Sequence, residues 1–341
     1  MNSFDYIDND DCLDPYTNLA MEEYVLRHMN PGRDYLMFYR NDPSVVIGRN
    51  QNIFEEINVS YVRENDIHVV RRLSGGGAVY HDHGNLNFSF VTRYEQSRLH
   101  NFRFFNEPVV KVLRSLGVPA ELNDRSDILA CGRKISGNAQ FSSRGRMFSH
   151  GTLLFNTHLD EVERTLAVQM IGIRSRSHKS VRSVVANILE FLHKPLDIHR
   201  FRELLLDGLR TNGVIGSHRK LTDVDRQKIR KIREQRYNRW EWNVGRSPRF
   251  NLVRTRQIGE HRITIRLEVE KGVIRSLSLK GDPEWIPEIT SKMSSIGGKL
   301  TGLRYEPEEI ERVLRINSDP LLTEQIPVSD FKQLIYSEDD S

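Results

Sequence analysis

Three consecutive glycines, Gly75, Gly76 and Gly77, are the feature that most constrains this 341-residue chain. Residues 69–70 before them and the alternating residues 86–90 after them are typical of strands, so the glycines connect two strands and begin no helix. A plain turn rarely needs three glycines, because each of them loses much conformational freedom on folding. We therefore predict a ligand loop, in which successive backbone N–H groups can bind an anion. The preceding arginines, Arg71 and Arg72, can bind a carboxylate or phosphate with their guanidinium groups.

The composition fits a soluble globular protein, because 38% of the residues are hydrophobic and 28% are charged. The length allows one large domain and a small one, or two medium domains. No apolar run approaches the roughly 20 residues that cross a bilayer. Two cysteines form no disulfide framework or zinc motif, and the acidic N-terminus has no apolar signal core, so we expect a cytoplasmic protein without membrane contact. The net charge of +4 is compatible with acidic partners or nucleic acid, but it is weak evidence for either.

A second informative stretch runs from Asp127 to Lys134. An acidic residue before a short strand, a turn and then a lysine suits a nucleotide site. Asp127 could hold Mg²⁺, and Lys134 could stabilise negative charge on a phosphate or acyl oxygen. A lysine at the start of a strand is, however, more often a solvated charge. Cys131 has no histidine beside it in sequence that could activate its thiol, so we expect it to be inert.

The remaining segments give weaker signals. Residues 48–52 are either a polar edge of a site or a solvated loop, and residues 173–181 look like a mobile basic loop. A helix is predicted over 19–29 with Asn18 as its N-cap, and others over 55–65, 105–116 and 184–191. Beyond residue 249, the alternation predicts strands over 250–256, 262–270 and 273–279, followed by helices over 287–296 and 307–314. Neither a Walker A motif nor G-x-G-x-x-G is present.

Taken together, these motifs resemble the lipoate–protein ligases of the bacterial A type. Their order and spacing make the resemblance specific, and it extends over nearly the whole chain. The segments that carry it are 71–82 with Gly84 and Asn85, 45–49 with Gln51 and Asn52, 125–127, 134–139, 150–154, 180–182, and 240–243 with Gly245, Ser247 and Pro248.

The resemblance implies an α/β (α+β) fold with a large catalytic domain of the biotinyl/lipoyl ligase type, built on a mixed sheet, over residues 1–245. A small α+β accessory domain is implied over residues 249–337. The implied enzyme uses ATP and Mg²⁺ to convert lipoate into lipoyl-AMP, and it releases pyrophosphate. It then transfers the lipoyl group to a lysine of an apo lipoyl domain, in an E2 subunit of a 2-oxoacid dehydrogenase or in the glycine-cleavage H protein.

The resemblance also assigns residues to these substrates. Lys134 is implied to be the catalytic residue and Asp127 the metal ligand. Those implied to bind ATP or the adenylate are Arg72, Gly75, Gly76, Gly77, Ala78, Val79, Tyr80, Asp127, Lys134, Ser180 and Arg182. Those implied to bind lipoate are Arg49, Arg71, Ser74, His81, Lys134, Ser136, Gly137 and His150. The aliphatic part of lipoate should lie in an apolar slot near Val45, Val46 and Val79.

Two other functions stay open at this point. One is a lipoyl or octanoyl transferase that moves the acyl group between carrier proteins without ATP. The other is a binding module for nucleic acid or acidic partners. Aromatic residues that could stack on bases are nearly absent from the basic segment 219–239, which is predicted to be a helix, so we expect no nucleic-acid partner. That helix is either a solvated face or a docking site for acidic lipoyl domains.

Overall fold

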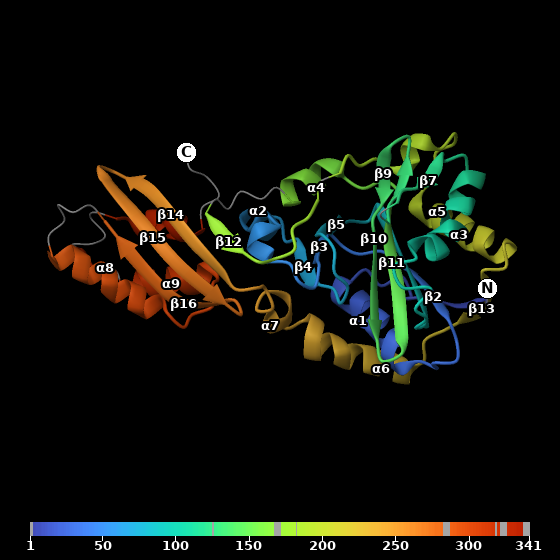
Figure 1. The fold of residues 1–341 in the computed structure, drawn as a ribbon, viewed down its shortest axis with the longest axis horizontal. Coiled ribbons are helices and arrows are strands. Elements are labelled where there is room, and N and C mark those ends of the chain that lie inside the picture. Colours follow the sequence, from blue (N-terminus) through green and yellow to red (C-terminus); the bar gives the residue numbers. More distant parts are fainter. Residues whose placement is uncertain are drawn as a thin grey trace. The chain divides into compact units, whose positions relative to one another are not determined.

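The structure is a computed structural model, and it divides the chain into two compact units (Figure 1). It describes residues 3–124, 126–166, 172–181, 183–281, 287–317, 319–320 and 326–336. The first unit consists of Met1–Arg49, Ser60–Leu166 and Ser180–Arg239. The second unit consists of Asn50–Val59, Ala167–Lys179 and Trp240–Ser341. Within the described residues, no helix is long and apolar enough to cross a membrane.

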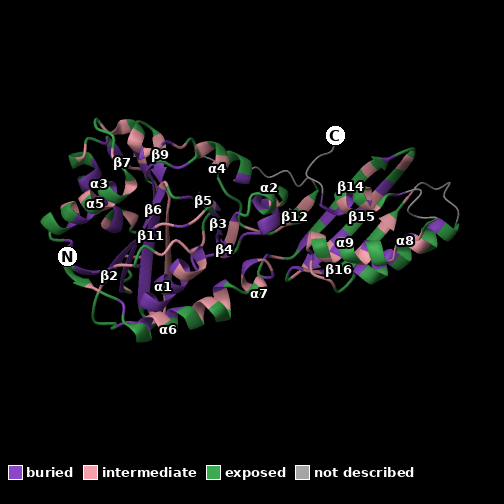
Figure 2. Cartoon of the chain, turned by 180° about the vertical axis from the view of Figure 1, so that it is seen from behind, coloured by how far each residue is buried: buried purple, intermediate pink, exposed green. Residues whose placement is uncertain are grey.

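A six-stranded mixed sheet forms the centre of the first unit, in the order β10–β11–β6–β2–β1–β13. These strands are β1 (Phe4–Ile7), β2 (Tyr35–Tyr39), β6 (Asn85–Arg93), β10 (Asn138–Ser143), β11 (Arg146–Leu154) and β13 (Ile215–Arg219). Strand β1 pairs in parallel with β2 and β13, and the other pairs are antiparallel. The long strands β6 and β11 are buried along almost their whole length (Figure 2).

Two helices cover the face of this sheet on which the alternating residues of β6 are apolar. Phe88 and Phe90 of β6 belong to one buried cluster with residues of α3 (Phe102–Ser115) and α5 (Ile198–Thr211). Helix α1 (Pro15–His28) packs against β6 and β11. The remaining described helical segments of this unit are α2 (Val59–Glu64), whose first residue belongs to the second unit, α4 (Leu159–Leu166), α6 (Asp223–Ile232), the 3₁₀ turn η2 (Ile188–Phe191) and the π-turn η3 (Arg233–Tyr237).

Two smaller sheets carry the candidate site. In the first, β3 (Ser44–Ile47) lies between β4 (His68–Arg71) and β5 (Val79–His81), parallel to β4 and antiparallel to β5. The glycines therefore connect two strands, but the second is β5 and not the predicted strand over 86–90, which belongs to β6. In the second, β7 (Ala120–Leu122), β8 (Ile128–Ala130) and β9 (Arg133–Ser136) form an antiparallel meander, and Lys134 lies on its last strand.

The prediction for the start of the first helix was wrong. Helix α1 begins at Pro15, and the carboxylate of Asp14 caps it by accepting hydrogen bonds from the backbone N–H groups of Tyr16 and Thr17. The Asn18 amide instead donates to the backbone oxygen atoms of Cys12 and Arg40 and to the Asn41 side chain. A buried asparagine with three acceptors around it holds separate segments together, and no local pattern distinguishes that role from a cap.

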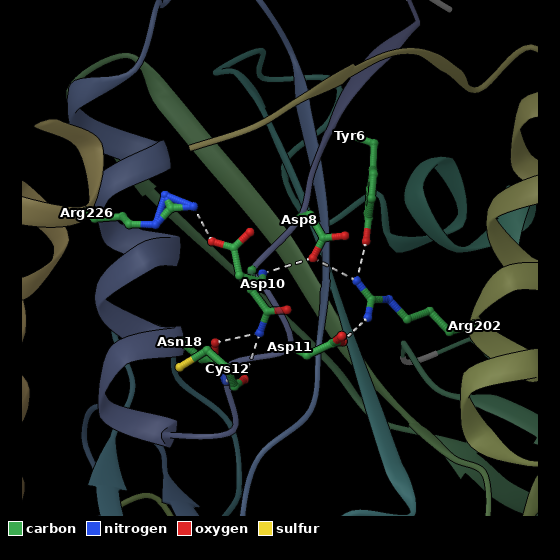
Figure 3. A network of polar contacts seen from close by, with 9 residues as sticks. Tyr6, Asp8, Asp10, Asp11, Cys12, Asn18, Arg202 and Arg226 are labelled. Atoms are coloured by element: carbon green, nitrogen blue, oxygen red, sulfur yellow. Dashed lines mark hydrogen bonds and ion pairs between the residues drawn. The ribbon is translucent and has the colours of Figure 1, made fainter. Parts of the chain in front are cut away.

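The helix predicted over 219–239 was wrong at its N-terminal end, because Arg219 belongs to β13 and α6 starts after the Thr222 cap. Several of its arginines form ion pairs inside the protein: Arg226 with Asp10, Arg233 with Asp14 and Arg236 with Glu23. Figure 3 shows that Arg226 and Arg202 bind neighbouring parts of one acidic loop, with Arg202 donating to Tyr6, Asp8 and Asp11. For these arginines the charge has a structural role.

The second unit is a four-stranded antiparallel sheet, in the order β12–β14–β15–β16, with helices packed on it. The strands are β12 (Ile173–Ser175), β14 (Phe250–Ile258), β15 (His261–Glu270) and β16 (Val273–Lys280). The helical segments are η1 (Ile53–Glu55), α7 (Trp240–Asn243), α8 (Pro287–Leu300), α9 (Pro307–Ile316) and α11 (Val328–Tyr336). The three predicted strands and both predicted helices beyond residue 249 are present.

Three local predictions need correction. Residues 173–175, expected in a mobile loop, form the edge strand β12, because β14 supplies hydrogen bonds that the short segment's own sequence cannot indicate. Residues 55–65 are not one helix, since η1 ends at Glu55 and α2 starts at Val59. Residues 184–191 contain only the 3₁₀ turn η2.

Candidate active site

The glycine loop folds around the guanidinium group of Arg72, which is buried. Its Nη atoms donate to the backbone oxygen atoms of Val46 (2.9 Å), Gly75 (2.6 Å) and Gly77 (2.7 Å). Its Nε donates to Ser74 Oγ at 3.0 Å. Burial lowers the pKa of Arg72 to about 10, so the group stays protonated at neutral pH. The cation thus fixes the shape of the loop from inside.

Ser180 packs directly on the glycines. A Cβ atom at Gly77 would lie 2.8 Å from Ser180 Oγ and 3.2 Å from its Cα, so only glycine allows this approach. Ser180 Oγ accepts a hydrogen bond from the backbone N–H of Ala78 at 2.9 Å. Val79 and Tyr80 continue into β5. The structure therefore brings the predicted adenylate-binding residues of the loop together with Ser180, whereas Arg182 lies outside the described residues.

A buried hydrogen-bond chain joins this loop to helix α1 and strand β11. Glu22 Oε1 lies 2.8 Å from His150 Nδ1, and His150 Nε2 lies 2.8 Å from Ser74 Oγ. With the carboxylate accepting from Nδ1–H, Nε2 accepts the Ser74 hydroxyl proton, and Ser74 Oγ accepts from Arg72. The geometry resembles a serine–histidine–acid triad, but Ser74 is fully buried, so its hydroxyl orients the loop and does not act as a nucleophile.

Glu22 is the member of this hydrogen-bond chain that the sequence did not predict. It is separated from His150 by 128 positions and is only 2% exposed. Its position in the middle of helix α1 carries no local signal for a buried role, because acidic residues on helices usually face solvent.

Substituting Glu22 with glutamine should lower the free energy of unfolding by about 1.5–3 kcal/mol, the contribution of a hydrogen bond to a charged group. Glutamine has the same shape, but it removes the charge that balances Arg72 through the chain. Urea unfolding measures the change, and Glu163→Gln, at an exposed position on α4, should change stability by less than about 0.5 kcal/mol. Equal stability of Glu22→Gln and the wild type would contradict this role.

His81 lies buried at the end of β5. Its Nδ1 lies 2.9 Å from the Asn41 side-chain nitrogen, so Nδ1 accepts and Nε2 carries the proton. Among the described residues, Nε2 has no hydrogen-bond partner. Burial, with Arg72 and His150 nearby, lowers the pKa of His81 to about 3, so the ring is neutral at neutral pH. An unpartnered buried N–H group is a donor available to a ligand.

The depressed pKa of His81 predicts that stability falls as the pH is lowered from about 6.5 to about 3, because over that range the unfolded chain binds a proton that the folded one does not. The slope due to this group is at most about 1.4 kcal/mol per pH unit. His81→Asn should make the stability–pH curve shallower by up to that amount in urea unfolding between pH 4 and pH 6. An unchanged slope would show that His81 titrates normally.

Lys134 lies on β9 with its ammonium group held in place. Nζ is 3.0 Å from Asp127 Oδ1, and the two side chains are 25% and 16% exposed, so the pair is shielded but accessible. A Cβ atom at Gly137 would lie 3.0 Å from the Lys134 Cε and 3.1 Å from its Nζ. Glycine at this position therefore leaves room for the lysine side chain, and Asp127 and Gly137, predicted for different substrates, both lie beside Lys134.

The chain between residues 180 and 186 links the two halves of the site. At one end Ser180 contacts the glycine loop, and at the other the backbone N–H of Lys134 donates to the Val184 oxygen at 2.9 Å. The Ala186 N–H in turn donates to the Lys134 oxygen at 3.0 Å, which places residues 184–186 parallel to β9. One short segment thus holds both the glycine loop and the lysine strand.

Several residues expected to bind lipoate also make contacts within the protein. Arg71 is fully buried and donates to the Gly48 backbone oxygen at 2.8 Å, and Ser136 is fully buried and accepts from Asn138. Both shape the backbone around the site. Arg49 is partly exposed, and its guanidinium lies 5.4 Å from the centre of the Phe141 ring. Val45 and Val46 are core residues, so the expected apolar slot does not open at those two side chains.

Comparison with known proteins identifies the family of both parts of the chain. Residues 14–210 match the family model described as the lipoyl protein ligase A/B catalytic domain, and residues 247–335 match the bacterial lipoate protein ligase C-terminus. The chain is 47% identical over 333 residues to the lipoate-protein ligase LplJ of Bacillus subtilis (strain 168), an alignment that covers 97% of this chain and 99% of that protein.

Two solved structures are also similar. A lipoate-protein ligase A bound with ATP is 31% identical with a TM-score of 0.57, over 72% of this chain and 99% of the other. The bipartite lipoate protein ligase of Thermoplasma acidophilum, studied with its E2 lipoyl domain, is 28% identical with a TM-score of 0.61, over 72% of this chain and 97% of the other. The expected ligase-type fold, a mixed sheet with a C-terminal domain, is confirmed.

Proposed function

This chain belongs to the lipoate–protein ligase family and is an enzyme of that class, and from this premise we propose the chemical role of each site residue. Lipoate and ATP are its substrates, as in the similar ligases. The observation that best supports the proposal is the Lys134 ammonium group, held by Asp127 over Gly137 and joined by residues 180–186 to the glycine loop.

In the first step the lipoate carboxylate attacks the α-phosphorus of ATP, and pyrophosphate leaves. Negative charge accumulates on the phosphate oxygens, so fixed donors stabilise the transition state. The glycine-loop backbone, shaped by Arg72, supplies N–H donors at residues 75–80, and Ser180 closes on it. Lys134 binds the oxygen atoms at the junction of the carboxylate and the phosphate. The neutral His81 offers its Nε2–H to the lipoate side of the site.

In the second step the ε-amine of the acceptor lysine attacks the lipoyl carbonyl, and AMP leaves. The mixed anhydride is already activated, so the enzyme needs no covalent intermediate. Lys134 stabilises the oxyanion of the tetrahedral intermediate, a role that backbone donors play in other acyl transfers. The Ser74 hydroxyl is bonded to His150 and Arg72, so it orients the loop and takes no part in the transfer.

A magnesium ion fits this site only if the phosphates of the nucleotide supply most of its ligands. In the described part of the chain, no three His, Cys, Asp or Glu side chains cluster to hold a metal ion, and Asp127 contributes a single accessible carboxylate. That arrangement suits Mg²⁺, which commonly binds one or two carboxylates together with substrate phosphates. Held there by Asp127, it would neutralise charge on the phosphates.

The acceptors we propose are lipoyl domains of E2 subunits and the glycine-cleavage H protein, in the cytoplasm. The similar ligase of Thermoplasma acidophilum was studied with an E2 lipoyl domain, which supports the first class of acceptor. We further propose that residues 1–245 carry catalysis and that residues 249–337 act as the accessory domain.

One experiment tests this function against transfer without ATP. The protein is incubated with lipoate, Mg²⁺ and an apo lipoyl domain, with or without ATP, and the mass of the acceptor is measured. The proposal predicts a lipoyl mass increment only with ATP. A mass increment from a lipoylated donor protein without ATP, and no gain on adding ATP, would favour the transferase.

A further inference from the structure

The segment before Ser180 is held by the second unit, although it lies between two parts of the catalytic domain in sequence. Strand β12 pairs with β14, with Ile173 opposite Leu252 and Ser175 opposite Phe250. The Val253 N–H donates to the Gly172 oxygen at 3.2 Å, which extends the pairing by one residue. Residues 172–175 are therefore an added edge strand of the accessory sheet.

Beyond β12, one buried carboxylate gathers the side chains of the segment. Glu55, at the end of η1, is 7% exposed. Its Oε2 accepts hydrogen bonds from the hydroxyls of Ser175 and Ser177, the latter at 2.9 Å, and from the Asn52 amide at 3.1 Å. Lys179 Nζ lies 3.5 Å from the other oxygen, Oε1, and the His178 N–H donates to the Asn50 oxygen.

Burial of the Glu55 carboxylate costs free energy unless neighbouring groups compensate for the lost water contacts. Burying a carboxylate requires charged partners and donors, and Glu55 obtains most of them from residues 175–179. Among the described residues, its Oε1 has no hydrogen-bond partner, so the cluster relies on the flexible Lys179 side chain at that oxygen. A contact of this kind holds a segment and can also be released.

The next residue, Ser180, is the one that contacts the glycine loop within the first unit. Between the last Glu55 contact at Lys179 and the Ala78 contact at Ser180 there is no spare chain. Because Lys179 and Ser180 are consecutive, release of residues 175–179 also removes a restraint on Ser180.

We propose that Glu55 is a positioning residue for adenylate formation, which holds residues 175–179 so that Ser180 closes on the glycine loop over the nucleotide. This inference rests on the proposed ligase function. Loss of the carboxylate frees the segment, weakens the Ser180 contact and thereby weakens the binding of ATP. The chemistry at Lys134 stays unchanged once ATP is bound.

Limited proteolysis tests the positioning without using activity. Trypsin can cleave after Arg174, Arg176 and Lys179, and cleavage in a held segment requires local opening. In the ligand-free protein, Glu55→Ala should be cleaved there about tenfold faster than the wild type or more, and Ser177→Ala should fall between them. The matched control is Glu241→Gln, which removes an exposed ion pair with Arg304 in the same unit and should be cleaved at the wild-type rate. Equal cleavage of Glu55→Ala and the wild type would overturn the proposal.

Kinetics then separate positioning from a purely structural role. In pyrophosphate release with lipoate and no acceptor, Glu55→Ala should raise the KM for ATP about tenfold with kcat changed less than about threefold. Transfer from supplied lipoyl-AMP to an acceptor should keep the wild-type rate. Glu55→Gln, which keeps an acceptor for the serines, should partly restore the KM and serves if the alanine variant does not fold. An unchanged KM for ATP in both Glu55 variants would refute the inference. If the wild-type protein itself shows no ATP-dependent activity, the ligase function is refuted, but the proteolysis result still stands.

Discussion

Replacing Lys134 with alanine is expected to lower acceptor modification by at least about a hundredfold, the usual effect of removing a donor to a developing oxyanion. The ammonium group is positioned by Asp127 at 3.0 Å and has access to the site, since a quarter of its side chain is exposed. Alanine leaves Asp127 unpaired and removes the donor from both steps. The effect should fall mainly on kcat and should appear in pyrophosphate release as well as in transfer.

The control for this prediction lies three residues away. Cys131 is exposed in the turn between β8 and β9, with a φ angle of +49°. Alanine tolerates that backbone no worse than cysteine does, so Cys131→Ala should keep wild-type activity. Full activity of Lys134→Ala would remove the role that we give to this lysine, and an inactive Cys131→Ala would instead point to a thiol intermediate. Both rates are measured by the mass of the acceptor.

The second large effect concerns Arg72. Replacing it with lysine keeps the positive charge but presents one nitrogen where the guanidinium reaches three backbone oxygens and one hydroxyl. At least two of these buried acceptors lose their donor, at a cost of about 1–3 kcal/mol each, so the free energy of unfolding should fall by about 3 kcal/mol or more. The loop should also bind ATP more weakly, because its shape depends on this cation.

An exposed arginine provides the matched comparison. Arg200 on α5 pairs with Glu203 at 2.8 Å, with both side chains more than half exposed. Arg200→Lys should change the free energy of unfolding by less than about 1 kcal/mol. Urea unfolding of both variants decides the matter: equal and small losses would show that the Arg72 contacts contribute little to the loop.

Residues whose role depends on local chemistry were predictable from the sequence. Three glycines between strand patterns indicate a loop. Asp127 and Lys134 lie at the two ends of a short strand and turn, and the β8–β9 meander brings Lys134 Nζ to 3.0 Å from Asp127 Oδ1. The contacts of Glu22 and Asn18 were not, because their partners lie on strands and loops far along the chain. Such contacts depend on how α1 packs across the sheet, which no nearby residue encodes.

The sequence also did not predict that residues before 249 belong to the second unit, and the reason is related. A continuous range from residue 249 onward describes its three long strands, whose alternation is strong. The edge strand β12 has only three residues, and Glu55 lies on a single 3₁₀ turn. Both join the second unit through pairing and buried hydrogen bonds with distant partners, so composition along the chain cannot assign them.

The most direct test of the central claim is to look for the intermediate itself. The protein is mixed with ATP, Mg²⁺ and lipoate in the absence of any acceptor, freed of unbound ATP, and then given an apo lipoyl domain. The account predicts bound lipoyl-AMP, formed with an equal amount of pyrophosphate, and its conversion into lipoylated acceptor and AMP without further ATP. Failure to form lipoyl-AMP by a protein that nonetheless lipoylates the acceptor would contradict an acyl-adenylate site built from the glycine loop and Lys134.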